Sequence, residues 1–182
     1  MHEPDAKVAV WDPLVRVMHW SLVATVLLSW MTKEGAGKWH EWLGYAASAT
    51  VLVRVTWGVI GSRYARFTQF VRRPGTTLHY GARVLRGSAP RYLGHNPLGG
   101  WMTLALLIGV GLTGLTGWLY TTPRYWGVEW MEDTHNAMAI AVLLLAALHV
   151  AGVITTSLTH RENLIGAMIH GSKRAAQADD VD

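Results

Sequence analysis

The fold is decided by residues 134–158, which read THNAMAIAVLLLAALHVAGVITTSL and contain no Asp, Glu, Lys or Arg. About 20 consecutive apolar residues are enough to cross the hydrocarbon core of a bilayer as a helix. Three further stretches meet this requirement, at about residues 13–32, 39–60 and 97–120. The sequence therefore predicts an all-α fold, a transmembrane four-helix bundle whose apolar surface contacts membrane lipid.

The composition agrees with a membrane protein and restricts its cofactors. Only 15% of the 182 residues are charged, whereas soluble domains carry about 25%. The chain has no cysteine, which excludes disulfides, Cys-ligated zinc, iron–sulfur clusters and covalently attached c-type haem. Any haem in this chain must therefore be held by His alone.

Most Lys and Arg residues lie on one side of the predicted spans. They occupy the connection 61–95 and the two terminal flanks, whereas the other side carries Lys33, Lys38 and Arg124. The positive-inside rule then places both termini and this connection in the cytoplasm. The basic pI, near 9.6, thus reflects membrane topology, and no nucleic-acid partner is expected.

The spans and their connections are expected to form one domain over residues 1–175, followed by a flexible tail at 176–182. Stretches 76–86 and 162–173 mix apolar and basic residues, so we expect short interfacial helices there. No cleavable signal peptide is expected, because the first residues are acidic rather than basic.

Four histidines, His19, His40, His135 and His149, lie inside the predicted spans or at their ends. Ionisable side chains within a membrane span indicate a functional site. His135 and His149 are separated by about four helical turns, so they share one helix face and lie about 21 Å apart along the axis. This spacing puts one of them near each surface of the bilayer.

Depth pairs these two histidines with the others. His19 lies about 9 Å from the cytoplasmic start of its span, and His149 about 12 Å from the cytoplasmic end of its own. His40 and His135 each fall in the first turn of a span that begins on the outer side. Two facing imidazoles are the axial ligands of a haem b. We therefore expect two haem irons, an inner one held by His19 and His149 and an outer one held by His40 and His135.

Three other residues are candidates for the cofactor site. Gly44 lies one turn after His40, where a bulky side chain would collide with a porphyrin. Arg54 shares that helix face, and either pairs with a haem propionate or extends to the lipid headgroups. Asn96 precedes the third span, where it either caps the helix or, with His95, donates hydrogen bonds to a quinone carbonyl.

Small residues and one further arginine are open to two interpretations. The third span has no His, and its glycines fit close packing of either another helix or a flat macrocycle. They are Gly109, Gly111, Gly114 and Gly117. Arg16, three residues before His19, has the same alternatives as Arg54, with extension to the headgroups favoured.

These segments together resemble the bacterial cytochrome b561 and Ni,Fe-hydrogenase b-type cytochrome family, which includes the membrane subunit of respiratory formate dehydrogenase. The resemblance covers about residues 8–172. It rests on five stretches in a fixed order: WDPLVRVMHW with His19, KWHEWLGY with His40, HNPLGGW, EDTHNAMA with His135, and LLLAALHVAGV with His149.

The resemblance implies a four-helix membrane bundle with two b haems in the bacterial inner membrane, with the same histidine pairing. It also implies electron transfer between a quinone and a periplasmic partner, namely a c-type cytochrome, a dehydrogenase or a hydrogenase. In the formate dehydrogenase relative, an Asn before the third helix contributes to the quinone site, and Asn96 occupies the matching place. The chain would then be an electron-transfer subunit rather than a stand-alone enzyme.

Two other classes of function remain open at this stage. A membrane metal or proton transporter would use the same histidines, although it would need carboxylates in the spans and only Glu41 is close. An anchor protein would dock a periplasmic enzyme without redox activity. The sequence also leaves a homodimer open.

Overall fold

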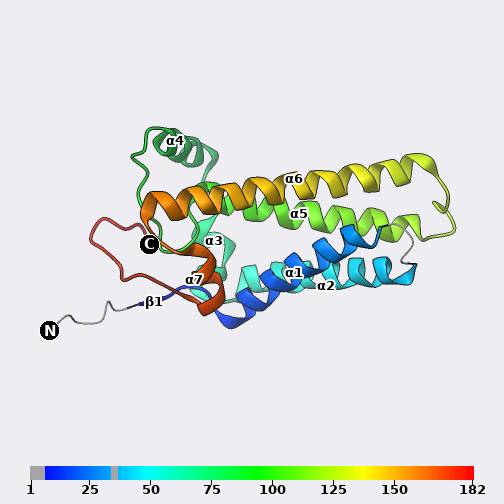
Figure 1. Ribbon diagram of the computed structural model, residues 1–182, viewed down its shortest axis with the longest axis horizontal. Helices are drawn as coiled ribbons and strands as arrows, with labels where there is room; N and C mark the ends of the chain where they lie inside the picture. Colours follow the sequence, from blue (N-terminus) through cyan, green and yellow to red (C-terminus); the bar gives the residue numbers. More distant parts are fainter. Residues whose placement is uncertain (1–6, 34–36) are drawn as a thin grey trace. The chain divides into compact units, whose positions relative to one another are not determined.

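Four long helices account for most of the chain in the computed structural model, which describes residues 7–33 and 37–182. Each is long and apolar enough to cross a membrane, and Figure 1 labels them in chain order. They are α1 (Pro13–Met31), α2 (Lys38–Ile60), α5 (Pro97–Tyr120) and α6 (Glu129–His160). The prediction of a transmembrane helical bundle is confirmed, and the chain is a multi-pass membrane protein.

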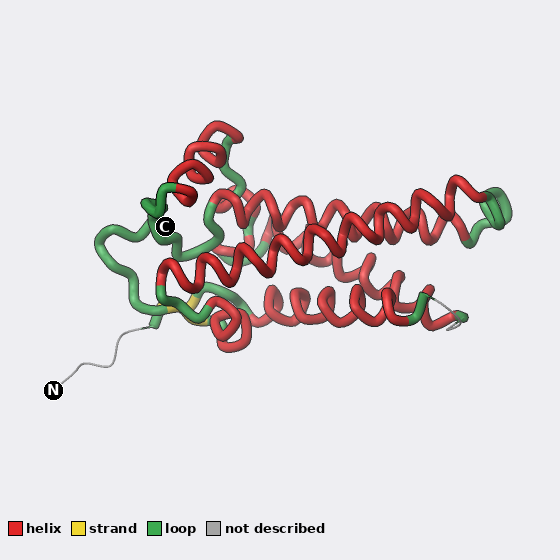
Figure 2. The backbone as a smooth tube through the Cα atoms, turned by 45° about the horizontal axis from the view of Figure 1, so that its top comes forward, coloured by secondary structure: helices red, strands yellow, loops and turns green. Residues whose placement is uncertain are grey.

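Short elements fill the connections, and the two strands are the smallest of them (Figure 2). The connection after α2 contains the 3-10 helix η1 (Arg63–Ala65), α3 (Phe67–Phe70) and α4 (Pro74–Leu85). After α6 comes α7 (Leu164–His170), and β1 (Val8–Ala9) pairs antiparallel with β2 (Ser172–Lys173). The helices expected at 76–86 and 162–173 are thus present as α4 and α7.

Two of the long helices begin at a side-chain cap, and the cap at Asn96 is one that the sequence predicts. The Asp12 Oδ1 atom accepts a hydrogen bond from the Val15 N–H at 2.9 Å, and Pro13 occupies the first helical position of α1. The Asn96 Oδ1 atom accepts from the Gly99 N–H at 2.8 Å, ahead of Pro97. Both caps satisfy backbone donors that a helix start leaves free.

Helix α6 starts at Glu129 rather than at the predicted residue 134. Its first turn carries Glu129 and Glu132, whose negative charges interact favourably with the positive end of the helix dipole. Gly127, with φ +70°, turns the chain just before this helix. Hydropathy alone misses a charged first turn, and His135 consequently lies beyond the first turn in which it was expected.

The chain divides into two compact units that are described separately. Unit 1 comprises Met1–Arg16, Trp57–Thr103 and Leu148–Asp182, and unit 2 comprises Val17–Thr56 and Leu104–Ala147. Large apolar side chains of the long helices are exposed in both units. This is the arrangement expected of helices whose outer faces contact lipid tails.

Within unit 2, α5 packs against its neighbours through its glycines. A Cβ atom added to Gly109 would lie 3.0 Å from Cγ2 of Val142 on α6, and one added to Gly114 would overlap the Ser48 hydroxyl on α2. Small residues at these positions allow helix backbones to approach closely. Gly109 and Gly114 therefore serve helix packing, the first of the two interpretations drawn from the sequence.

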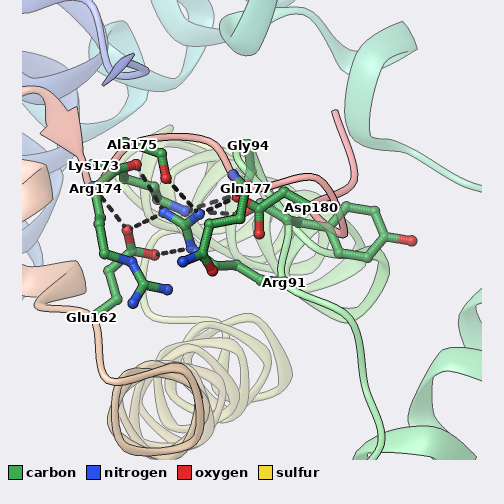
Figure 3. Close-up of polar contacts among 9 residues, drawn as sticks. Arg91, Gly94, Glu162, Lys173, Arg174, Ala175, Gln177 and Asp180 are labelled. Carbon is green, nitrogen blue, oxygen red and sulfur yellow. Dashed lines mark hydrogen bonds and ion pairs between the residues drawn. The ribbon is translucent and has the colours of Figure 1, made fainter. Parts of the chain in front are cut away.

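Unit 1 contains a buried cluster of charged side chains centred on Arg91 (Figure 3). The guanidinium of Arg91 donates two hydrogen bonds to the Glu162 carboxylate, at 2.6 and 3.3 Å, and also pairs with Asp180. Lys173 Nζ donates to the backbone carbonyl oxygens of Tyr92 and Gly94 at 3.2 and 3.4 Å. Two cations and two carboxylates are thereby brought together from segments far apart in the sequence.

Burial and charge act in opposite directions on the ionisation of this cluster. Burial alone would raise the pKa of Glu162, but the hydrogen bond from Arg91 and the charges of Lys173 and Arg91 hold it below its usual value. Burial lowers the pKa of Lys173 to about 8, against the attraction of Glu162 and Asp180. The Glu162 carboxylate is therefore firmly charged at neutral pH, whereas Lys173 loses its proton more easily than an exposed lysine.

The last two residues make specific contacts, and the flexible tail expected at 176–182 stays a prediction. Val181 forms a parallel bridge with Tyr92, and Asp182 accepts hydrogen bonds from Arg63 and from the Tyr64 hydroxyl at 2.6 and 2.8 Å. The polar composition of the segment suggested fraying. Its contact partners lie elsewhere in the sequence, so composition gave no sign of them.

Candidate functional site

His40 of α2 and His135 of α6 lie close together in unit 2. Their ring centroids are 6.0 Å apart, and the ring planes are nearly perpendicular, at 80°. Both side chains are half-buried. The structure thus brings together two imidazoles that are far apart in the sequence and that sequence analysis paired by depth.

Backbone carbonyl groups orient both rings. The Nδ1 atom of His40 lies 3.0 Å from the carbonyl oxygen of Ser29, and Nδ1 of His135 lies 3.1 Å from that of Thr113. A carbonyl oxygen only accepts hydrogen bonds, so Nδ1 carries the proton in each ring and Nε2 keeps its lone pair. Metal-binding histidines characteristically donate their other ring N–H in this way.

The spacing of the two rings fits a single metal atom between them. When two opposed imidazole nitrogens each bind a metal at about 2 Å, the ring centroids lie about 6 Å apart. The pair supplies two nitrogen donors, which is the axial set of a haem iron whose remaining ligands come from the porphyrin. Across residues 7–33 and 37–182, no group of three or more His, Asp or Glu side chains is arranged to hold a metal ion.

Two glycines shape the surroundings of this pair. A Cβ atom added to Gly117 of α5 would lie 2.9 Å from Cε1 of His135, so the absence of a side chain lets the ring lie against the helix. A Cβ atom added to Gly44 would meet no atom within 4 Å. The space beside Gly44 is therefore open, and its place beside a porphyrin stays a prediction, whereas Gly117 makes room for the His135 ring.

His19 and His149 belong to different units, so their pairing stays a prediction. His19 lies on the unit 2 part of α1, with its ring edge-on to Trp20 at 5.0 Å between centroids. His149 lies on the unit 1 part of α6. Both side chains are half-buried.

Arg54 lies inside unit 2, with only 5% of its surface exposed. An arginine that extended to the lipid headgroups would place its guanidinium on the outside of the protein. The burial of Arg54 therefore disfavours that interpretation and leaves the pairing with an anionic cofactor group as the hypothesis.

Arg16 contacts the end of α7, and the two partners considered from the sequence, a haem propionate or the lipid headgroups, stay predictions. Its Nη1 atom donates a hydrogen bond of 2.6 Å to the carbonyl oxygen of Ile169, in the last turn of α7. Helix C-termini leave carbonyl groups without partners inside the helix, and basic side chains commonly satisfy them. Arg16 thus joins the start of α1 to the end of α7, a contact that no local sequence pattern indicates.

His95 and Asn96 lie in unit 1, and both have evident structural roles. The His95 ring packs between Trp11 and Phe70, at centroid distances of 4.7 and 4.5 Å. Asn96 caps α5 through its side-chain oxygen. The cap is therefore confirmed, and the additional contact with a quinone stays a prediction.

Sequence analysis missed the residues that support the histidines. Ser29 and Thr113 contribute backbone carbonyl groups, and the Thr116 hydroxyl lies 3.3 Å from Nδ1 of His135. Backbone groups leave no trace in a sequence, and threonine is common in membrane helices. Only the packing of α1 against α2 and of α5 against α6 identifies them.

Residues 10–171 match a family model described as prokaryotic cytochrome b561. The match includes all four long helices and the four histidines expected to bind haem. No curated protein and no solved structure gives a significant match.

Proposed function

Because the chain belongs to the prokaryotic cytochrome b561 family, we propose that it is a dihaem b-type cytochrome of the bacterial inner membrane. As a member of this family it is a membrane b-type cytochrome that binds haem and takes part in electron transfer. In our proposal it carries electrons between the quinone pool and a periplasmic c-type cytochrome, dehydrogenase or hydrogenase.

One observation carries the proposal: the close pair His40 and His135, each with Nδ1 against a backbone carbonyl group. The arrangement leaves both Nε2 lone pairs for an iron atom. When bound, haem b supplies an iron that exchanges one electron. The two histidines would supply both protein ligands of the iron, which would favour electron transfer over the binding of oxygen.

The second haem is proposed between His19 and His149. Its support is the shared face of His135 and His149 on α6 and the matching depths of His19 and His149. The buried guanidinium of Arg54 is proposed to neutralise a haem propionate, because a cation inside the membrane needs an anionic partner.

Quinone is proposed to react near His95 and Asn96, which precede α5. The excess of Lys and Arg in the connection 61–95 supports a cytoplasmic location. His95 and Asn96 combine hydrogen-bonding groups with the aromatic rings of Trp11 and Phe70. Such a surface suits a quinone, which is flat, largely apolar and accepts hydrogen bonds at its carbonyl groups.

Haem stoichiometry of the purified protein tests the proposal. Reduced-minus-oxidised spectra should show a b-type α band, and the pyridine haemochrome assay should give two haems per chain. His135→Ala and His149→Ala should each remove one haem. The matched control His79→Ala should retain both, because His79 is exposed on α4, outside the spans.

A preparation with one haem per chain would contradict the dihaem proposal. Zinc instead of iron in metal analysis would favour the transporter, and a redox-silent protein would favour the anchor.

A further inference from the structure

Helix α5 contributes no histidine, yet three of its residues surround His135. Nδ1 of His135 lies 3.1 Å from the Thr113 carbonyl oxygen and 3.3 Å from the Thr116 hydroxyl oxygen. Gly117 lets the ring approach the helix this closely. The His135 N–H group is therefore shared between two oxygen atoms of one helix turn.

The direction of the Thr116 hydrogen bond follows from the protonation of the ring. If Nε2 of His135 binds iron, Nδ1 carries the proton, so Thr116 Oγ1 must accept rather than donate. The hydroxyl proton of Thr116 has other acceptors available, because Oγ1 lies 3.0 Å from the carbonyl oxygens of both Leu112 and Thr113. Thr116 thus donates to its own helix while its lone pair faces Nδ1.

Donation to the helix alone is ordinary for threonine. Thr103 on the same helix hydrogen-bonds the Gly99 carbonyl oxygen in this way, at 2.9 Å. What distinguishes Thr116 is the additional contact with His135. His40, the other histidine of the outer pair, differs from His135 in this respect. Its Nδ1 atom lies 3.0 Å from the Ser29 carbonyl oxygen.

We propose that Thr116 is a positioning residue that lowers the reduction potential of the outer haem by accepting a second hydrogen bond from His135. An extra acceptor at Nδ1 makes the imidazole a stronger electron donor, which stabilises the oxidised iron. The inference rests on the proposed outer pair of His40 and His135. It gives α5 a specific role in tuning electron transfer.

Thr116→Val is the direct test, because valine has nearly the same shape and lacks the hydroxyl group. The variant should keep two haems per chain, and a potentiometric titration followed at the α band should show one component moved to a more positive potential. Thr116→Ser should restore the original value. Thr103→Val, the matched control, should leave both components unchanged.

Repeating the titration in a His149→Ala background shows which haem carries the shift in potential, because only the outer haem should remain there. Thr116→Ala serves as the second variant, since a smaller side chain cannot collide with the ring, and it should shift the potential in the same direction. An unchanged or more negative potential in both variants overturns the inference, as does an equal shift in Thr103→Val. A wild-type protein without haem would instead overturn the proposed function, so the two failures are distinguishable.

Discussion

Replacing Glu162 with Gln should destabilise unit 1 by about 3 kcal/mol, because it leaves buried cations without their counter-charge. The side chains of Arg91 and Glu162 are only 6% and 7% exposed, and two hydrogen bonds join them. With Asp180 and Lys173, the cluster holds two positive and two negative charges. After the substitution, Arg91 and Lys173 share the single carboxylate of Asp180.

The magnitude follows from the cost of breaking a buried ion pair, about 3–5 kcal/mol when one partner is removed. Gln keeps an oxygen that can accept one N–H from Arg91, so the lower end of the range applies. For a protein of this size, about 3 kcal/mol corresponds to a fall of about 6–12 °C in the melting temperature.

Thermal unfolding in detergent micelles, followed by tryptophan fluorescence, measures this loss. The matched control is Asp182→Asn, because the Arg63–Asp182 pair has the same chemistry but side chains that are 61% and 42% exposed. Exposed pairs contribute about 0–1 kcal/mol. Arg91→Met combined with Glu162→Leu should recover part of the loss, since removing both charges leaves Lys173 and Asp180 balanced.

The reasoning is refuted if Glu162→Gln lowers the melting temperature no more than Asp182→Asn does. It is also refuted if the double variant is destabilised by the sum of its single changes, because the two side chains would then act independently.

Three further predictions concern single positions. Gly117→Ala should displace the His135 ring and lower the occupancy of one haem in the spectrum, whereas Gly75→Ala, on α4 outside the spans, whose added Cβ meets no atom within 4 Å, should not. Because burial lowers the pKa of Lys173 from 10.5 to about 8, the unfolded chain binds more protons between these pH values. Stability should therefore rise with pH across this window, and Lys173→Met should abolish that rise in unfolding experiments. Asn96→Ala removes the cap of α5 and should cost about 1 kcal/mol in the same unfolding assay.

The long helices could be predicted because their signal is local. Uncharged apolar runs define α5 and most of α6, and the caps at Asp12 and Asn96 mark helix starts within a few residues. The first turn of α6 was missed, because a charged turn outside the apolar run carries no hydropathy signal. The bounds of α4 and α7 were predicted only approximately for the same reason, because polar and charged residues at a helix end carry no hydropathy signal.

The candidate site was predicted in part. Histidines inside apolar helices are conspicuous, and helical periodicity alone relates His135 to His149. The contact of Arg16 was missed, because the carbonyl oxygen that its Nη1 atom contacts belongs to Ile169, at the other end of the sequence. A charged side chain near a span end has many candidate partners, and only its surroundings select one.

The sequence by itself determined that this is a membrane protein of four spans with no cysteine to attach or ligate a haem, since hydrophobic length and the absence of cysteine need no tertiary information. The tertiary structure alone decided which groups meet: the Ser29 and Thr113 carbonyls at the histidine rings, Thr116 beside His135, and the carboxylates around Arg91. The physical reason is the separation along the sequence over which each property acts. Burial and periodicity are properties of neighbouring residues, whereas hydrogen bonds and ion pairs between distant segments exist only after the helices have packed.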